Sequence, residues 1–432
     1  MTKSLSYEEA VAYLFSLQKY GIKFGLSKTS NLLKAFGNPQ FHQKYIHIAG
    51  TNGKGSVAAM LESILMHSGL KVALYTSPHL VRFTERFRVD GKEIHPDRVA
   101  DLVKDLKMMI DPAQPPTFFE VTTAMALIVF ARENPDISIL EVGMGGRLDA
   151  TNVIRPVASI ITNISLEHQA FLGRRLTDIA REKAGIIKPG VDLVTAATQP
   201  QVIKVLRDTC RRRRSPFWRV GKEIRYRRSG TLLDYYGLGR TVKGLRLGLM
   251  GKHQARNAAL ALAAVELLEK RGFTVTSCHV REGLNKTRWP GRMQVVSKQP
   301  LMILDGAHNP DAMRVLVDSM RDAFQWEHLI LVLGVMGDKD IPKIAKRIVP
   351  IADYVICTRP EYYRAADPNV LLKEAASFRK KGEIIPTIPE ALKKAKEKAG
   401  TGDVILVTGS LFTVGEAMAS LDPEAVHPDK LR

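Results

Sequence analysis

The sequence predicts an α/β protein with two domains: a P-loop-type domain with a mostly parallel sheet, followed by a Rossmann-like α/β domain. Three observations predict this fold class. The 432 residues exceed the size of one typical core. Short β-branched runs alternate with stretches of helical periodicity along both halves of the chain. A glycine-rich turn with a lysine, GTNGKGS, joins the first of these strands to the helix that follows it.

In the first domain, the alternation of strands and helices favours a mostly parallel sheet. The expected strands are YIHIA, KVALYT, ISILEV, VASIITNI and DLVTAA. Helices are expected at the N-terminus, at 56–68, at 117–133, up to Lys183 and at 253–271. Between about 216 and 250, short aromatic runs such as PFWRV and LLDYYGL predict a small antiparallel patch.

A linker is expected at Lys286–Arg292, KTRWPGR, because Pro290 and Gly291 interrupt the pattern before a new strand begins. The predicted domains are therefore 1–288 and 289–432. The second domain is expected to contain the strands LMILD, HLILVLG, YVICT, EIIPTI and DVILVTG. Its helices are expected at 310–323, 341–349, 368–379 and 389–398, with one more at the end.

Composition restricts the classes of function. No apolar run reaches the roughly 18 residues that span a bilayer, and the N-terminus has no small-residue cleavage site, so a cytoplasmic protein is expected. Three cysteines without C-x-x-C spacing support neither a disulfide framework nor a zinc site. The formal charge of +20 is densest at Arg211–Arg214 and Arg225–Arg228. No nucleic-acid-binding motif accompanies this charge, so a solvated surface, or a field that attracts polyanionic small substrates, is preferred over nucleic-acid binding.

The segment IHIAGTNGKGS predicts a nucleotide-phosphate cradle. Its glycines allow backbone N–H groups to turn inward, the next helix N-terminus favours anions, and Lys54 adds a charge for the β- and γ-phosphates. Gly55 stands where a Ser or Thr usually binds the metal, so Mg²⁺ ligands are expected from elsewhere in the chain. ATP is the expected ligand, and the residues expected to bind it are Gly50, Thr51, Asn52, Gly53, Lys54, Gly55 and Ser56.

Three polar side chains follow other expected strands: Ser77 after KVALYT, Glu141 at the end of ISILEV, and His168 after VASIITNI. The carboxyl ends of parallel strands meet at one crevice, so these side chains are expected to lie near the phosphate cradle. A carboxylate at a buried strand end is costly unless it is paired or bound to a metal. Ser77, Glu141 and His168 are therefore the candidate Mg²⁺ ligands. Taken alone, His168 would more often be a structural histidine, but its position at a third strand end favours the role of ligand.

These motifs give nearly the whole chain a resemblance to a known family. In their order and spacing they resemble the Mur-ligase superfamily, and within it the folylpolyglutamate synthase/dihydrofolate synthase family. The resemblance implies an ATP-dependent carbon–nitrogen ligase that adds L-glutamate to folates, and also to dihydropteroate, through an acyl phosphate. The segments that carry it are GTNGKGS, TSPHL, EVGMGGRLDATN, EKAGIIKPG, GKHQARNA, WPGR, DGAHNP and TGSLF.

The resemblance also implies roles for residues of the first domain. The three candidate Mg²⁺ ligands and Lys54 match the family's metal ligands and its phosphate-loop lysine, which makes Lys54 a candidate catalytic residue. Lys183, in EKAG, matches a second catalytic lysine, which is commonly carbamylated. A carbamate there would supply an additional anion. Pairing of Lys183 with Glu182 or another acid is the alternative.

Roles in the second domain and in substrate binding are implied in the same way. Asp305 and His308, from DGAHN, match catalytic residues, and Asp305 also matches a nucleotide contact. Asn257 and Arg292 match residues that reach the nucleotide from the hinge side. The TSPHL segment implies that Ser77, Pro78 and His79 bind the substrate. Arg86 and Ser410 match the family's residues that hold the incoming glutamate.

Two other functions stay open at this point. A Mur-type cell-wall ligase shares the chemistry, but the 49 residues before Gly50 are too few for the UDP-binding domain that such enzymes add. A basic nucleotide-switch protein that binds nucleic acid would have little use for DGAHNP. The expected partners are ATP, L-glutamate and a folate or dihydropteroate, bound by a monomer, without nucleic acid or membrane. The sequence does not determine whether one or both substrates are used, nor the length of the polyglutamate product.

Overall fold

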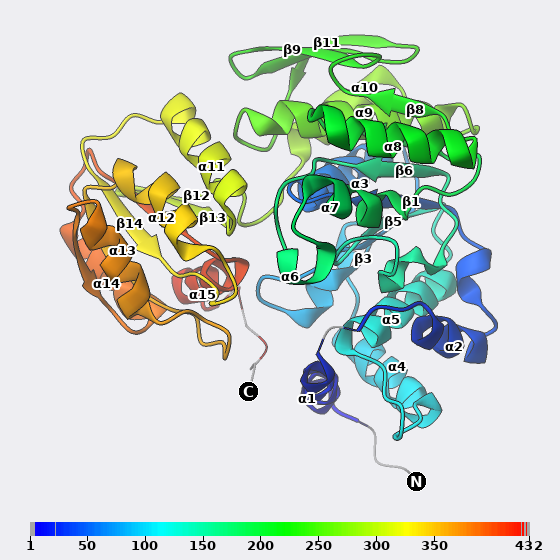
Figure 1. Ribbon diagram of the computed structural model, residues 1–432, viewed down its shortest axis with the longest axis horizontal. Coiled ribbons are helices and arrows are strands. Elements are labelled where there is room, and N and C mark those ends of the chain that lie inside the picture. The colour runs from blue at the N-terminus through cyan, green and yellow to red at the C-terminus, as the bar shows by residue number, and fades with distance from the viewer. Residues whose placement is uncertain (1–4, 22, 425, 427–428, 430–432) are drawn as a thin grey trace.

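The computed structural model describes residues 5–21, 23–424, 426 and 429. Two α/β domains lie beside each other, the N-terminal one blue to green and the C-terminal one yellow to red (Figure 1). The first domain ends with a helix at Lys286, and the sheet of the second begins at Gln294. The predicted fold class is confirmed, since each domain combines helices with a mostly parallel sheet.

The large sheet of the N-terminal domain has eight strands within the described residues, in the order β4-β3-β2-β5-β1-β6-β7-β8. Neighbouring strands pair in parallel except β2 with β3 and β3 with β4. The central strands β1, β5 and β6 are buried along their whole length, as expected of a sheet covered on both faces. The strands are β1 (Tyr45–Ala49), β2 (Val72–Tyr75), β3 (Phe87–Val89), β4 (Lys92–Glu93), β5 (Ile137–Glu141), β6 (Ala158–Ile161), β7 (Asp192–Thr195) and β8 (Phe217–Arg219).

Helices cover both faces of this sheet. Ile46 and Ile48 of β1 point into a core shared with α3, α9 and α10, whereas Tyr45 points into the core built by α1, α2, α4 and α5. On that second face α7 and α8 pack around Ala49. The helices are α1 (Tyr7–Ser16), α2 (Ser27–Ala35), α3 (Lys54–His67), α4 (Pro96–Met109), α5 (Phe118–Glu133), α6 (Gln169–Leu172), α7 (Leu176–Ala184), α8 (Pro200–Arg213), α9 (His253–Glu269) and α10 (Ser277–Lys286).

Five of these helices, α2, α4, α6, α8 and α10, are absent from the sequence-based expectation. For α4, α8 and α10 the N-terminal signals are nevertheless present in the sequence. Pro96 and Pro200 occupy the first helical positions of α4 and α8, where proline's fixed φ is favourable and its missing N–H has no cost. Thr276 caps α10 by accepting a hydrogen bond from the backbone N–H of His279.

A small antiparallel sheet of β9 (Arg225–Ser229), β10 (Leu232–Tyr236) and β11 (Thr241–Arg246) packs near α9 and α10, as Figure 1 shows. The predicted antiparallel patch is therefore confirmed for this segment. The prediction is wrong for PFWRV, which forms β8 and pairs in parallel with β7 at the edge of the large sheet. The reason is the intervening α8, because a strand that returns through a helical crossover enters the sheet parallel to its predecessor.

Glu266 of α9 holds the turn between β10 and β11. Its buried carboxylate accepts hydrogen bonds from the Tyr235 hydroxyl (2.6 Å) and from the backbone N–H groups of Leu238 (3.1 Å), Gly239 (2.5 Å) and Arg240 (3.1 Å). A buried carboxylate that is satisfied by four donors stabilises the element that supplies them. Glu266 therefore fixes the small sheet to the N-terminal domain.

The C-terminal sheet has six strands in the described chain, in the order β12-β13-β17-β14-β15-β16, and only β12 is antiparallel to its neighbour. Helices α11, α12 and α13 pack on one face and α14 and α15 on the other. The strands are β12 (Gln294–Lys298), β13 (Leu301–Asp305), β14 (Leu329–Leu333), β15 (Tyr354–Cys357), β16 (Lys381–Ile384) and β17 (Val404–Thr408). The helices are α11 (Pro310–Ala323), α12 (Ile341–Ile348), α13 (Pro368–Ser377), α14 (Ile388–Lys398) and α15 (Leu411–Leu421).

This doubly wound arrangement confirms the expected Rossmann-like domain. Short 3-10 helices occupy several of the connections of both domains: η1 (Leu17–Tyr20), η2 (Pro39–Phe41), η3 (Phe83–Arg86), η4 (Ala150–Val153) and η5 (Val349–Ile351). Within the described ranges, none of the helices has the length and apolar character that crossing a membrane requires.

Replacing Glu266 with alanine should destabilise the N-terminal domain by about 3 kcal/mol, because it leaves the buried donors of the β10–β11 turn without an acceptor. Urea unfolding followed by circular dichroism measures the change. Glu282→Ala is the matched control: this α10 glutamate makes only an exposed pair with Lys286, and its loss should change stability by less than about 0.5 kcal/mol. Equal unfolding midpoints for the two variants would contradict the role given to Glu266.

Candidate active site

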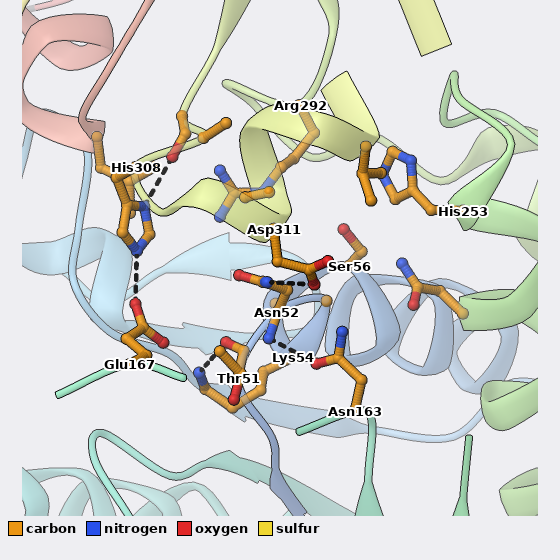
Figure 2. Close-up of a pocket in the computed structure, with 18 of the residues that line it drawn as sticks. Thr51, Asn52, Lys54, Ser56, Asn163, Glu167, His253, Arg292, His308 and Asp311 are labelled. Carbon is orange, nitrogen blue, oxygen red and sulfur yellow. Dashed lines mark hydrogen bonds and ion pairs between the residues drawn. The ribbon is translucent and has the colours of Figure 1, made fainter. Parts of the chain in front are cut away.

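A cleft between the two domains collects reactive side chains from both (Figure 2). The N-terminal domain contributes the loop after β1 and the ends of other parallel strands, and the C-terminal domain contributes residues that follow β13. The structure thus brings together most of the residues that the sequence singled out. Those that line the cleft are 51–56, Ser77, Pro78, Glu141, His168, Asn257, Arg292, Asp305 and His308.

The loop after β1 is held in shape by the residues that follow β6. The backbone N–H groups of Thr51 and Asn52 donate to the backbone oxygen of Asn163 (2.9 Å) and to its Oδ1 (2.8 Å). The Thr162 hydroxyl donates to the Asn52 carbonyl at 2.7 Å. Helix α3 begins directly afterwards at Lys54, so its free N–H groups and its dipole face the cleft. This arrangement is suited to phosphate groups.

Two glycines of the loop are required by close neighbours. Gly53 precedes α3 with φ of 88°, and a Cβ there would lie 2.8 Å from the Asn257 side-chain oxygen. A Cβ on Gly55 would lie 2.8 Å from the indole nitrogen of Trp289. The indole therefore occupies the space that a Ser or Thr side chain would need at position 55. This contact accounts for the glycine in the position that usually binds the metal.

Lys54 and Glu141 face each other inside the cleft. The Lys54 ammonium lies 3.9 Å from Glu141 Oε1 and donates to the Thr51 carbonyl at 3.3 Å. The backbone N–H of Ser77 donates to Glu141 Oε2 at 3.3 Å. Burial raises the pKa of Glu141, and the Lys54 charge and the Ser77 N–H oppose this shift. A cation placed next to this carboxylate would stabilise its charged form further.

Ser77, Glu141 and His168 fit a divalent cation, because a hydroxyl, a buried carboxylate and an imidazole line the same cleft beside the phosphate loop. His168 adopts a left-handed backbone conformation, with φ of 50°, which is uncommon for a side chain of this size. Burial lowers the pKa of His168 to about 4, although Glu167 opposes the shift. The imidazole is therefore neutral at pH 7 and keeps the lone pair that a metal ligand needs.

Lys183 does not line the cleft itself, but its ammonium donates to the carbonyl of Gly50, at the start of the cleft loop, at 2.8 Å. The alternative of a pair with Glu182 is not observed, because Glu182 instead binds Arg147 at 2.9 Å. Burial, together with the charge of Lys54, lowers the pKa of Lys183 to about 7. A large share of this lysine is thus neutral at pH 7, and the neutral amine is the form that reacts with CO₂.

The C-terminal domain presents Asp305 and His308 at the end of β13. Asp305 accepts from the backbone N–H groups of Met293 and Ala307, each at 2.9 Å. Burial raises the pKa of Asp305, and Arg292 and the two N–H groups oppose the shift. The His308 ring has its Nδ1 2.9 Å from the Gly306 carbonyl and its Nε2 3.2 Å from Oε1 of Glu167, in the N-terminal domain. Figure 2 shows this bridge across the cleft.

The phosphate loop itself also contacts the C-terminal domain. The Asn309 side-chain amide donates to the Asn52 side-chain oxygen at 2.9 Å, and the Asn52 amide lies 3.4 Å from both Asn309 Oδ1 and Asp311 Oδ2. Asn309 caps the N-terminus of α11 by accepting from the N–H of Ala312. The loop that is suited to phosphates is therefore bonded directly to a helix of the other domain.

Arg86 and Ser410 have surroundings that differ from an open ligand site. Arg86 is buried, donates from Nε to Nδ1 of His79 at 2.8 Å, and lies over the Phe118 ring. The Ser410 hydroxyl is buried and caps α15 by accepting from the N–H of Thr413. In the described part of the chain neither residue lines the cleft or the second cavity beside it. Their contact with glutamate stays a prediction.

The second cavity adjoins the cleft on the other side of Gly55. Ser77 and Pro78 line both spaces, as do Glu141 and Arg292. The predicted substrate residue His79 lines only the second one, together with apolar side chains that include Trp289 and Met418. A largely planar molecule with a carboxylate could place that carboxylate in the cleft and its apolar part in this cavity.

Several residues of the cleft were not singled out from the sequence. Asn163 and Glu167 follow β6, and the same strand-end rule that selected His168 would have selected them. Asn309 and Asp311 directly follow the DGAH segment that supplied Asp305 and His308. The fifth, His253, begins α9. The signal was available in each case, but it did not indicate which neighbouring polar side chain points inward.

Comparison with known proteins places the chain within a family. The model of the Mur ligase middle domain matches residues 48–265, and that of the Mur ligase glutamate ligase domain matches residues 291–411. The dihydrofolate synthase/folylpolyglutamate synthase of Bacillus subtilis is 32% identical over 423 residues, which cover 95% of this chain and 98% of that protein. The probable bifunctional folylpolyglutamate synthase/dihydropteroate synthase of Haloferax volcanii is 36% identical over 433 residues, but this chain spans only 50% of its length.

Solved structures agree with this assignment. E. coli FolC in complex with DHPP and ADP superposes with a TM-score of 0.88 at 32% identity, over 96% of this chain and 98% of that one. Mycobacterium tuberculosis folylpolyglutamate synthase complexed with ADP gives a TM-score of 0.90 at 32% identity, over 96% and 99% of the two chains. The chain therefore belongs to the folylpolyglutamate synthase/dihydrofolate synthase family of the Mur ligase superfamily.

Proposed function

We propose that this protein is an ATP-dependent ligase that joins L-glutamate to the carboxylate of a folate, and also to that of dihydropteroate. The observation that carries the proposal is the single cleft in which the phosphate loop and Lys54 face Asp305 and His308 of the second domain. A ligase of this kind must transfer a phosphoryl group in one place and present an amine to the product of that transfer. Two domains that share one cleft meet this need.

The reaction proceeds in two steps. An oxygen of the substrate carboxylate attacks the γ-phosphorus of ATP, the bond to the β-phosphate oxygen breaks, and ADP leaves. The neutral amino group of L-glutamate then attacks the carbonyl carbon of the acyl phosphate, inorganic phosphate leaves with the bonding electrons, and the nitrogen loses a proton. Alignment of the amine and exclusion of water can each lower the barrier, alignment alone by roughly 7–11 kcal/mol.

Lys54 and the N–H groups at the start of α3 bind and neutralise the β- and γ-phosphates in this proposal. Mg²⁺, held by Ser77, Glu141 and His168, would supply further charge neutralisation on the phosphate oxygens. Asn257 and Arg292 contact the nucleotide from the hinge side. Gly50 to Ser56 form the cradle in this proposal, and the relatives solved in complex with ADP support nucleotide binding by this chain.

Catalytic roles are proposed for Asp305, His308 and Lys183 as well. Asp305 and His308 lie across the cleft from Lys54, where they can orient the acyl phosphate and the amine. A carbamate on Lys183 would place a negative charge behind the Gly50 carbonyl, close to Lys54. The substrate and glutamate contacts are proposed for Ser77, Pro78, His79, Arg86 and Ser410.

The activity on dihydropteroate rests on the names of the relatives. The Bacillus subtilis protein is called a dihydrofolate synthase as well as a folylpolyglutamate synthase, and the E. coli structure contains DHPP. A cell-wall ligase remains the second candidate by chemistry, and the two Mur ligase domain matches are compatible with it. The folate relatives cover nearly the whole chain, and this favours the folate reading.

The proposal includes a monomer that works in the cytoplasm without nucleic acid or a membrane. Cys210, Cys278 and Cys357 are free thiols, which is typical of a reducing compartment. The arginines of β9 are exposed on the edge strand of the small sheet, where they can attract anionic small molecules.

Release of phosphate from ATP in the presence of L-glutamate tests the proposed function. Tetrahydrofolate and dihydropteroate should each stimulate release, whereas a UDP-muramoyl peptide should not. Lys54→Ala should remove the activity while the protein keeps its melting temperature, because Lys54 contacts the cleft rather than the core. Stimulation by the UDP-muramoyl peptide alone would favour the cell-wall ligase.

Changing Glu141 or His168 to alanine should raise the Mg²⁺ concentration needed for half-maximal activity by about 10-fold or more, because each change removes one ligand. Magnesium titrations at saturating ATP measure this shift. His42→Ala removes an exposed histidine that does not line the cleft and serves as the control. Unchanged titrations in both cleft variants would place the metal elsewhere.

Lys183 should carry a carbamate when bicarbonate is supplied, and its occupancy should increase from pH 6 to pH 8, because the neutral amine becomes more abundant as the pH rises through about 7. A carbamate carbon signal in ¹³C NMR with labelled bicarbonate measures it. The signal should vanish in Lys183→Ala and persist in Lys188→Ala, a nearby lysine that donates to the Asn152 carbonyl. A short carboxylic acid should restore part of the activity of Lys183→Ala. A missing signal together with no rescue would contradict the carbamate.

A further inference from the structure

Glu167 of the N-terminal domain contacts two residues of the second domain at the cleft, His308 and Asn309. It follows β6 and precedes α6, and its side chain is only 10% exposed. One oxygen, Oε1, lies 3.2 Å from Nε2 of His308 and 3.3 Å from the side-chain amide of Asn309. The same oxygen is 3.9 Å from Nε2 of His168. A buried carboxylate in this position is costly unless its contacts with the second domain are made.

These contacts fix the orientation of the His308 ring. Its Nδ1 is 2.9 Å from the Gly306 carbonyl, and its Nε2 faces Glu167. When the ring is protonated, both nitrogens donate to these oxygens, and rotation of the ring would break one hydrogen bond or both. The Gly306 contact is local, whereas Glu167 comes from the other domain. The ring therefore has one orientation only when the two domains are in place.

We propose that Glu167 is a positioning residue for ligation, which sets His308 and the start of α11 against the phosphate loop. The inference rests on the proposed function, in which His308 helps to align the acyl phosphate and the amine. Glu167 acts on the reaction through His308. Its removal should therefore lower the rate of ligation far more than it weakens the binding of ATP.

A simpler role for Glu167 would be to hold the domains together. Helix α11 offers an internal comparison, since both of its ends are tied to the N-terminal domain. Asn309, which accompanies Glu167, caps its start. Near its other end, Asp322 pairs with Arg228 of β9 and with Lys252 before α9, each at 2.8 Å. Asp322 thus bridges the same two bodies but has no contact with His308 among the interactions described here.

The test compares Glu167→Ala, Glu167→Gln and Asp322→Asn in steady-state ligation with tetrahydrofolate. Glu167→Ala should lower kcat by about 10- to 100-fold and change the KM for ATP by less than about 3-fold. Glu167→Gln keeps an acceptor oxygen and should recover most of the loss. Asp322→Asn should leave kcat within about 3-fold of wild type. An equal loss of kcat in Asp322→Asn would show that both variants act only by weakening the contacts between the domains, and would overturn the positioning role.

A double-variant cycle examines whether Glu167 acts through His308. In the His308→Ala background, the further change Glu167→Ala should lower kcat by less than about 2-fold, because the group to be positioned is already gone. Multiplicative losses would show that Glu167 acts independently of His308 and would overturn the inference. Melting temperatures of all variants exclude loss of folding as the cause of low activity.

The same four proteins give a result that does not depend on activity. Because Glu167 and His308 are in contact, the decrease in melting temperature of the double variant should be smaller than the sum of the two single decreases. Additive decreases in melting temperature would show that Glu167 and His308 are not coupled, which would contradict the inference. If wild-type protein makes no product with any folate, the proposed function fails, and the thermal cycle still decides whether Glu167 and His308 are coupled.

Discussion

A phosphate loop that is contacted from three directions determines how the rest of this protein is arranged. Asn257 of α9 and Trp289 of the interdomain connection lie against Gly53 and Gly55 so closely that neither position has room for a Cβ. Asn52 of the same loop is bonded to Asn309 in the C-terminal domain. The start of α3 is therefore in contact with α9, with the interdomain connection and with the C-terminal domain. Its backbone N–H groups must still stay free for a ligand. Small residues in the loop make this crowding possible.

Burial of ionisable groups gives the cleft its chemical character. Glu141, His168 and Lys183 all have pKa values shifted toward the neutral form, and burial is the largest cause in each case. Glu167 is the exception: burial would raise its pKa, but the hydrogen bond from His308 and the nearby positive charges lower it instead. Buried ionisable groups of this kind respond strongly to an incoming phosphate or cation, because charges interact more strongly away from bulk water.

Two different kinds of contact join the domains. At the cleft the contacts are polar and partly buried, and they involve residues on which the proposed reaction depends. At the far end of α11 the pairs of Asp322 are more exposed, and such pairs contribute little to stability. The cleft contacts therefore couple the position of the C-terminal domain to the residues of the proposed reaction. Other contacts also join the domains, such as the Tyr362–Gln18 hydrogen bond and the packing of Leu80 against the core that contains Val414.

Much of the fold, and the core of the site, could be predicted from the sequence because local patterns encode them. Buried strands such as YIHIA, the loop that follows it, and the polar residues after successive parallel strands are all specified by neighbours in sequence. The direction of β8 could not be predicted in this way, because pairing depends on where α8 returns the chain. The pairing of Glu167 with His308, 141 residues away, and the contact of Gly55 with Trp289 also required the tertiary structure. A sequence pattern reports which elements form, whereas side-chain partners across domains are decided only when those elements pack.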